Sequence, residues 1–68
     1  MDSFKIKDEF IKLGQAMKAT GMCDTGAEAK ELIVGGQVQV NGEEETRRGR
    51  KLYPGDSFTF NGNTVTIE

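Results

Sequence analysis

The chain has 68 residues, of which 35% are hydrophobic and 29% are charged, and its formal net charge is -2. A chain of this length folds as one small domain, so we expect a single domain over residues 1–68 with no large buried substrate cavity. The sequence has no histidine and one cysteine, Cys23, which excludes an internal disulfide, a Cys/His zinc site and a histidine-dependent catalytic triad. We therefore expect a protein that is not an enzyme, with no metal and no cofactor, in which Cys23 is a small structural residue.

No apolar stretch approaches the roughly eighteen residues that a membrane-spanning helix needs, and the first residues lack the apolar core of a signal peptide. We therefore expect a cytoplasmic protein without a membrane segment. Near the start, Phe4 and Ile6 alternate with polar or charged residues and predict a short first strand.

A first helix is predicted over residues 13–20. Leu13, Ala16 and Met17 recur at the spacing that places side chains on one face of a helix. Gly21 follows as a left-handed cap, which is a common end for a helix because glycine has no Cβ to clash in that conformation.

A second helix is predicted to begin at Thr25. The residues from Thr25 to Glu28 match a capping box, in which the Thr25 hydroxyl accepts from the Glu28 amide and the Glu28 carboxylate accepts from the Thr25 amide. Ala29, Leu32 and Ile33 then repeat the apolar spacing of the first helix. Both helices are too short to be stable alone, so we expect them to pack as a hairpin on a sheet.

The sheet is predicted in the second half of the chain. Residues 37–42 alternate polar and apolar side chains, with Val38 and Val40 facing the core. They end in Asn-Gly, the strongest short-range signal for a tight hairpin turn.

Two further strands are predicted after residues 53–56, whose sequence Tyr-Pro-Gly-Asp fits a type II turn. Phe58 and Phe60 are expected to point inward from one strand, and Val65 and Ile67 from a last strand that follows a second Asn-Gly turn. Together these elements predict an α+β fold, with a helical hairpin packed on a small, mostly antiparallel, strongly twisted sheet.

Four of the nine positive charges of the chain fall within five consecutive residues. They are Arg47, Arg48, Arg50 and Lys51, with Gly49 between them. A regular strand would turn Arg48 and Arg50 to one face and Arg47 and Lys51 to the other. A bulge at Gly49 would instead re-aim these charges toward one edge. The cluster is either an idle solvated run or a binding surface for a polyanion.

An acidic run from Glu43 to Glu45 precedes the cluster and could pair with its arginines. Exposed ion pairs contribute only about 0 to 1 kcal/mol, so such pairs would not prevent phosphate binding. Lys12, Lys18 and Lys30 lie on or beside the predicted helices. They are either solvated singly or, if the helices lie beside the cluster, part of one continuous basic stripe.

The order of these motifs resembles the S-four RNA-binding domain, also called the alpha-L motif, and the resemblance covers most of the chain. It rests on the capped helix of residues 25–33, on Gly-Gln-Val-Gln-Val-Asn-Gly at residues 36–42 and on Gly-Asp at residues 55–56. The freestanding small bacterial members are the most similar. They share Leu-Gly-Gln, here at residues 13–15, and Arg-Arg-Gly-Arg-Lys, here at residues 47–51.

The resemblance implies a domain that holds structured RNA, often ribosomal or transfer RNA, through its helical pair and the adjoining strand and loop. Carried over by position, the implied RNA-binding residues are Lys12, Lys18, Thr25, Lys30, Gln37, Asn41, Arg47, Arg48, Arg50 and Lys51. Many members have an arginine directly after the capping residue, where this chain has Gly26. That departure removes one expected phosphate contact and makes the basic cluster more important.

We therefore predict a monomeric, non-catalytic module that binds structured RNA by charge and shape, with the ribosome as one candidate location. The rival hypothesis is a protein-interaction module that docks through the mixed-charge surface from Glu43 to Lys51. RNA binding predicts that reversing Arg48 and Arg50 to glutamate abolishes RNA retention and leaves the fold intact. Docking predicts the loss of a protein partner instead.

Overall fold

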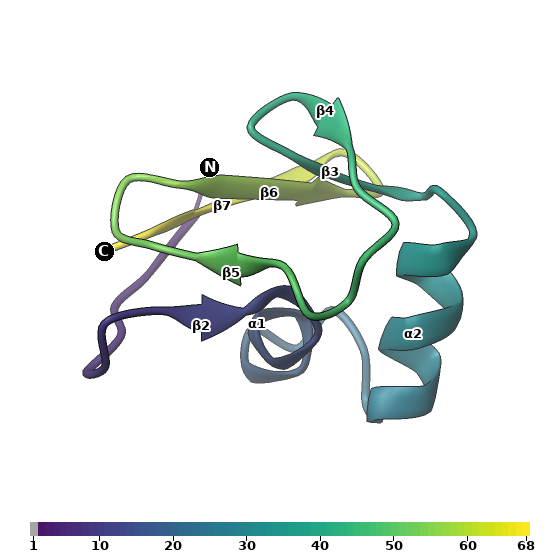
Figure 1. Ribbon diagram of the computed structural model, residues 1–68, viewed down its shortest axis with the longest axis horizontal. Coiled ribbons are helices and arrows are strands. Elements are labelled where there is room, and N and C mark those ends of the chain that lie inside the picture. The colour runs from purple at the N-terminus through teal and green to yellow at the C-terminus, as the bar shows by residue number, and fades with distance from the viewer. Residues whose placement is uncertain (1) are drawn as a thin grey trace.

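The computed structural model describes residues 2–68 and has two layers, with the helices on one face of the main sheet (Figure 1). The helices are α1 (Leu13–Ala19) and α2 (Gly26–Val34). The strands are β1 (Asp2–Phe4), β2 (Ile11–Lys12), β3 (Val38–Val40), β4 (Glu43–Glu44), β5 (Lys51–Leu52), β6 (Ser57–Phe60) and β7 (Asn63–Ile67).

Five strands form the main sheet in the order β1-β7-β6-β3-β4, and β2 pairs with β5 in a separate two-stranded sheet. Every pairing is antiparallel except that of β1 with β7. The predicted α+β fold, a helical hairpin on a mostly antiparallel sheet, is confirmed. The pairing of β2 with β5 places the chain just before α1 beside the end of the basic cluster (Figure 1).

Both helices end in a glycine cap, the first of them at the predicted Gly21. At the end of α1, Gly21 has φ of 80°, its amide donates to the Lys18 carbonyl at 3.1 Å, and the Met22 amide donates to Met17 at 2.9 Å. This pair of bonds is the Schellman motif, which satisfies carbonyls that have no partner within the helix. The end of α2 repeats it at Gly36, where φ is 78°.

The start of α2 confirms half of the predicted capping box. The Thr25 hydroxyl accepts from the Glu28 amide at 3.1 Å. The Glu28 carboxylate reaches one residue further back than expected and accepts from the Asp24 amide at 3.3 Å. Glu28 therefore also holds the turn that joins the two helices. Its charge lies at the N-terminal end of α2, where the helix dipole favours an anion.

The predicted turns between strands are confirmed. In each Asn-Gly turn both residues have positive φ, which defines the type I′ turn that matches the twist of paired strands. In the Tyr-Pro-Gly-Asp turn Gly55 has φ of 101°, and the Asp56 amide donates to the Tyr53 carbonyl at 2.9 Å, as a type II turn requires.

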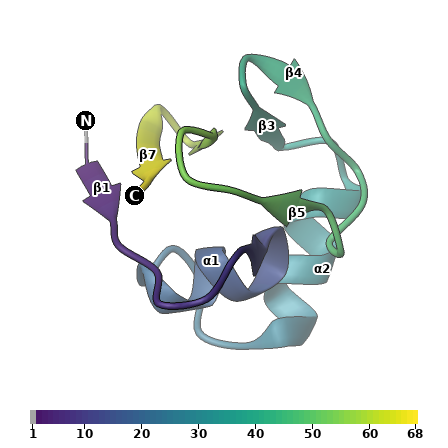
Figure 2. The same cartoon turned by 60° about the vertical axis from the view of Figure 1, so that its left-hand side comes forward.

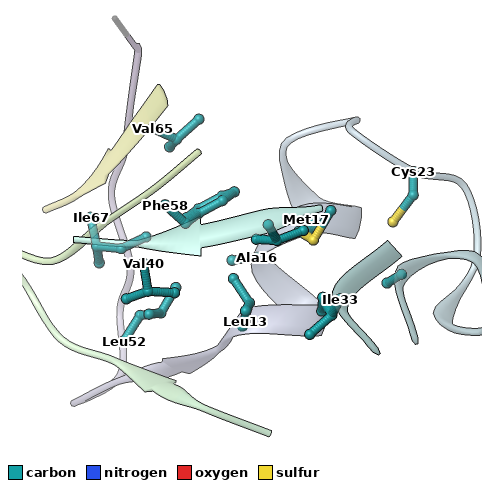
Figure 3. Close-up of a cluster of buried hydrophobic side chains, with 12 residues drawn as sticks. Leu13, Ala16, Met17, Cys23, Ile33, Val40, Leu52, Phe58, Val65 and Ile67 are labelled. Carbon is teal, nitrogen blue, oxygen red and sulfur yellow. The ribbon is translucent and has the colours of Figure 1, made fainter. Parts of the chain in front are cut away.

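The core lies between the helices and the main sheet, where side chains from both helices meet Phe58 and Val40 (Figure 3). Its buried members are Leu13, Ala16, Met17, Cys23, Ala29, Ile33, Val38, Val40, Leu52, Phe58, Val65 and Ile67. Phe60 was expected to point inward with Phe58 but is only half-buried, because it ends β6 beside an open hollow that Phe4 and Met22 also line. Burial raises the pKa of the Cys23 thiol, which fits a structural role for this residue.

Within residues 2–68 no helix is both long enough and apolar enough to cross a bilayer. The same residues contain no group of three or more histidine, cysteine or acidic side chains that could hold a metal ion.

Candidate nucleic-acid interface

The three arginines of the basic cluster lie on a loop, residues 45–50, that leads from β4 to β5 and is called the basic loop below, and Lys51 is the first residue of β5. It runs past α2 and reaches the start of α1 in both views of the ribbon (Figures 1 and 2). There the carbonyls of Arg50 and Arg48 accept from the amides of Leu13 at 2.8 Å and Gly14 at 3.0 Å. The side chain of Lys12, the N-cap of α1, makes no capping bond, so the basic loop caps this helix with its backbone.

The shape of the basic loop is fixed by Glu45, a buried residue that is only 7% exposed. Glu45 accepts from Arg47 Nε at 3.0 Å, from Arg47 Nη2 at 3.2 Å and from Arg50 Nη1 at 2.7 Å. It also accepts from the amides of Thr46 and Arg47, each at 3.1 Å. Hydrogen bonds from the two arginines hold the pKa of this carboxyl near 2, far below its ordinary value of 4.5.

The acidic run does pair with the arginines, as the sequence suggested, but the pairing is centred on a buried carboxylate and not on exposed ones. Of the three glutamates only Glu45 forms ion pairs with described residues, and it does so as a buried group, while Glu43 and Glu44 stay exposed on β4. The alternation of a regular strand also fails, because Arg47 and Arg50 converge on Glu45.

Three cations from separate segments meet around one hollow of about 290 Å³, called the first hollow below. It is lined by Lys12, Gly14, Gln15, Lys18, Gly26, Arg48 and Gly49. Lys12, Lys18 and Arg48 are exposed and take part in no ion pair with any residue from 2 to 68. The first hollow therefore gathers three positive charges that form no ion pair within residues 2–68, an arrangement that suits a phosphate.

The remaining charges of the cluster face a second hollow of about 580 Å³. Arg47, Gly49, Arg50, Lys51 and Tyr53 line this second hollow. Gly49 also lines the first hollow, so the two hollows adjoin at this glycine.

The structure places the other predicted site residues less closely. Thr25 precedes Gly26 at the edge of the first hollow, but its hydroxyl is used as a cap. Lys30 is exposed one helical turn beyond Gly26 and does not line the hollow. Gln37 is exposed at the other end of α2, and Asn41 lies beyond it at the far end of β3.

Asn41 is committed to the sheet rather than free to contact a ligand. Its amide nitrogen donates to Asp56 at 3.1 Å, and its side-chain oxygen accepts from the Ser57 amide at 3.0 Å. The structure therefore does not bring Gln37 or Asn41 to either hollow.

Sequence reasoning missed Gln15, Glu45 and Tyr53 as members of this region. Gln15 was noted only as part of the Leu-Gly-Gln motif, and the first hollow exists because the basic loop docks there. Glu45 looked like any member of an acidic run. The available signal was that Arg47 and Arg50 follow Glu45 by two and five residues, because a tight loop can bring residues at this spacing into contact.

Acid should weaken the fold partly through Glu45. Its folded-state pKa is about 2 against an ordinary 4.5, so its contribution to stability is complete above about pH 4.5 and is lost as pH falls toward 2. Urea unfolding near neutral pH and near pH 3 should show a smaller acid-induced loss of unfolding free energy for Glu45→Gln than for the unaltered chain. An equal loss in both proteins would assign the acid sensitivity to other carboxyls.

Comparison with known proteins finds one matching family model and similar curated proteins. A family model described as the S4 domain matches residues 4–68. The "Putative RNA-binding protein YbcJ" of Escherichia coli is 36% identical over 61 residues, covering 90% of this chain and 87% of that protein. The "Probable ribosome maturation protein RlbA" of Bacillus subtilis is 42% identical over 57 residues, covering 84% of this chain and 80% of that protein.

A solved structure has the same fold. The solution structure of YbcJ from Escherichia coli, described as revealing an alpha-L motif involved in RNA-binding, superposes with a TM-score of 0.74 at 35% identity. The superposition covers 98% of this chain and 86% of that one. The resemblance seen in the sequence motifs is thus confirmed for both family and fold.

Proposed function

Because this chain belongs to the S4 domain family, we propose that it is a non-catalytic module that binds structured RNA through the first hollow and the basic loop. The observation that carries the proposal is the meeting of Lys12, Lys18 and Arg48, without acidic partners among residues 2–68, around one hollow. Phosphates of a folded RNA supply the missing counter-charge. Arg48 presents a planar fork that suits a phosphate, and the two lysines act as point charges.

Recognition by shape and charge follows from the donors available. The polar side chains that line the first hollow are Lys12, Lys18, Arg48 and Gln15, and only Gln15 can also accept a hydrogen bond. Folded RNA exposes phosphates and 2′-hydroxyls more readily than base edges, so this site should discriminate little between sequences.

Ribosomal RNA is the target class that we favour over transfer RNA. Support comes from the relative in Bacillus subtilis, whose name refers to ribosome maturation. The proposal therefore places the protein, as a monomer, in the cytoplasm with the ribosome or its precursors. Crosslinking the protein to RNA in cells and sequencing the attached fragments tests this. Enrichment of ribosomal fragments is expected, and recovery of background RNA alone would contradict the proposal.

The rival function, docking of a protein on the surface from Glu43 to Lys51, receives less support. Arg47 and Arg50 already share the buried carboxylate of Glu45, so two of the four arginine and lysine side chains on that surface are engaged within the protein. Of the other two, Arg48 lies at the first hollow, which Glu43 and Glu44 do not line, and Lys51 lies at the second.

Replacing Gly26 with arginine should strengthen RNA binding. Gly26 lines the first hollow, has no positive φ, and a Cβ built on it meets nothing within 4 Å, so a side chain there has room. One added phosphate contact should steepen the slope of log affinity against log salt by about 0.7 to 0.9. Fluorescence anisotropy with a labelled ribosomal fragment over a salt series measures that slope.

The matched control is Ala27→Arg, which adds the same charge at the next position of α2. Ala27 is exposed and does not line the first hollow, so its variant should leave the slope unchanged. If both variants steepen the slope equally, net charge rather than the hollow would explain the gain.

A further inference from the structure

The second hollow differs from the first because an aromatic ring lies among its cations. Tyr53 follows β5 and is 43% exposed, one of the two large hydrophobic side chains left open to solvent among residues 2–68. It lines the second hollow together with Arg47, Arg50 and Lys51. Charge alone does not explain an exposed ring at this place, since a shorter polar residue would leave the same cations in position.

Tyr53 is held in place by its neighbours. Its amide donates to the Asp56 carboxylate at 2.8 Å, and its carbonyl accepts from the Asp56 amide at 2.9 Å. Its ring lies 5.8 Å from the Phe10 ring, centre to centre, at an interplanar angle of 50°. The Lys51 ammonium lies 4.9 Å from the centre of the same Phe10 ring. Phe10 thus contacts both Tyr53 and Lys51 and holds these two side chains at the second hollow in the absence of a ligand.

Arg47 keeps donors available beside this ring. Its side chain is 72% exposed, and its bonds to Glu45 use Nε and Nη2, whereas Nη1 makes no hydrogen bond with any described residue. Glu45 therefore orients the guanidinium without using all of its donors. An anion in the second hollow can bind Arg47 and Lys51 together.

Gly49 connects the two hollows. It lines both of them, and the space where its side chain would stand is open, since a Cβ placed on it would meet nothing within 4 Å. A chain of phosphates that leaves the first hollow can cross the basic loop at this point without meeting a side chain.

We propose that the second hollow binds an unpaired nucleotide that continues from the structured RNA in the first hollow. The base stacks on the ring of Tyr53, and its phosphate contacts Arg47 and Lys51. Stacking on an aromatic side chain accepts any base, which suits a site that follows recognition by shape. The inference rests on the proposed function and adds to it a preference for a junction between paired and unpaired RNA.

Tyr53 itself reports on this contact, because the chain has one tyrosine and no tryptophan. A blunt RNA hairpin and the same hairpin with a short oligoadenosine tail at its 5′ or 3′ end are titrated into the unaltered protein. Both RNAs should bind, and the fluorescence anisotropy of a dye on the loop of the hairpin measures this binding. Only a tailed hairpin should strongly quench the tyrosine emission, since only its tail reaches the ring.

Variants give an independent measurement. Tyr53→Ala should lose about 5- to 100-fold in affinity for the tailed hairpin and nothing for the blunt one, because stacking contributes about 1 to 3 kcal/mol per base. Tyr53→Phe keeps the ring and should keep the affinity for both. Circular dichroism checks that each variant is folded, and the fluorescence titration needs no variant at all.

The outcomes separate the inference from the function on which it rests. If both hairpins bind but quench equally and Tyr53→Ala changes neither affinity, the second hollow is not a nucleotide site while RNA binding stands. If neither hairpin binds, the proposed function and this inference fail together. Quenching by an oligoglutamate peptide, with none from the tailed hairpins, would overturn the inference in favour of a protein partner.

Discussion

Lys12→Glu combined with Arg48→Glu is expected to lower the affinity for structured RNA about 100-fold or more. Both side chains line the first hollow, come from different segments and have no acidic partner among residues 2–68. A hydrogen bond to a charged group contributes about 1.5 to 3 kcal/mol, and each reversal also places a negative charge against phosphate. Fluorescence anisotropy with a labelled ribosomal fragment at fixed salt measures the loss.

The fold should survive this double variant. The basic loop caps α1 through the backbone carbonyl of Arg48, which the substitution retains. Lys12 lies directly opposite Lys51 in the pairing of β2 with β5, so Lys12→Glu replaces a like-charge pair with an opposite one. By contrast, the reversal of Arg48 with Arg50 that the sequence suggested would put a second carboxylate against the buried Glu45 and would confuse unfolding with lost binding.

Lys5→Glu combined with Lys7→Glu is the matched control for the first hollow. It changes the net charge by the same amount, and both lysines are exposed and line neither hollow. This control should bind RNA within a few-fold of the unaltered chain. Equal losses in the two double variants would show that net charge alone governs binding, and no loss in the first would remove the first hollow as the RNA surface.

Glu45→Ala is expected to lower the free energy of unfolding by about 2 to 4 kcal/mol. The substitution leaves Arg47 and Arg50 without their shared carboxylate, and the amides of Thr46 and Arg47 without an acceptor. The partial exposure of both arginines keeps the cost below that of a fully buried pair. For a domain of this size the loss corresponds to a melting temperature about 10 to 25 °C lower.

The same variant separates two effects on RNA affinity. Glu45→Ala makes the surface more positive, which by itself would tighten binding. It also loosens the loop that positions Arg48 and caps α1, and we expect this effect to prevail, so that RNA binds more weakly. Glu43→Ala removes the same charge from an exposed side chain and should leave stability unchanged and affinity equal or slightly higher. Tighter binding by Glu45→Ala would mean that the order of the loop is irrelevant.

The local elements of this protein could be predicted because their causes are local. Gly21 and Gly36 end helices since each supplies a positive φ one residue past the last turn, and the Asn-Gly pairs close hairpins for the same reason. The alternation of Val38 with Val40 and of Val65 with Ile67 predicted which side of each strand is buried. Phe60 packs against the core as this rule predicts, but it is only partly buried, because burial at a strand end depends on what covers it.

The candidate site could be predicted only in part. The sequence pointed to Lys12, Lys18 and Arg48 as cations of interest, and the structure gathers these three around one hollow. It pointed equally to Asn41, whose side chain instead bonds to Asp56 and Ser57 across the sheet. Spacing along the chain could not separate these cases, because the contacts of a side chain depend on segments brought together by the fold.

The sequence by itself determined the helical hairpin, the type I′ turns and the presence of a dense basic run, since each depends on residues within a few positions of one another. Only the tertiary structure decided how that run is divided. Glu45 becomes buried and takes Arg47 and Arg50 as partners, while the carbonyls of the loop satisfy the open amides of α1. That docking brings Arg48 to the helical lysines, because the free amides at a helix start and a buried carboxylate both require partners that no neighbouring residue supplies.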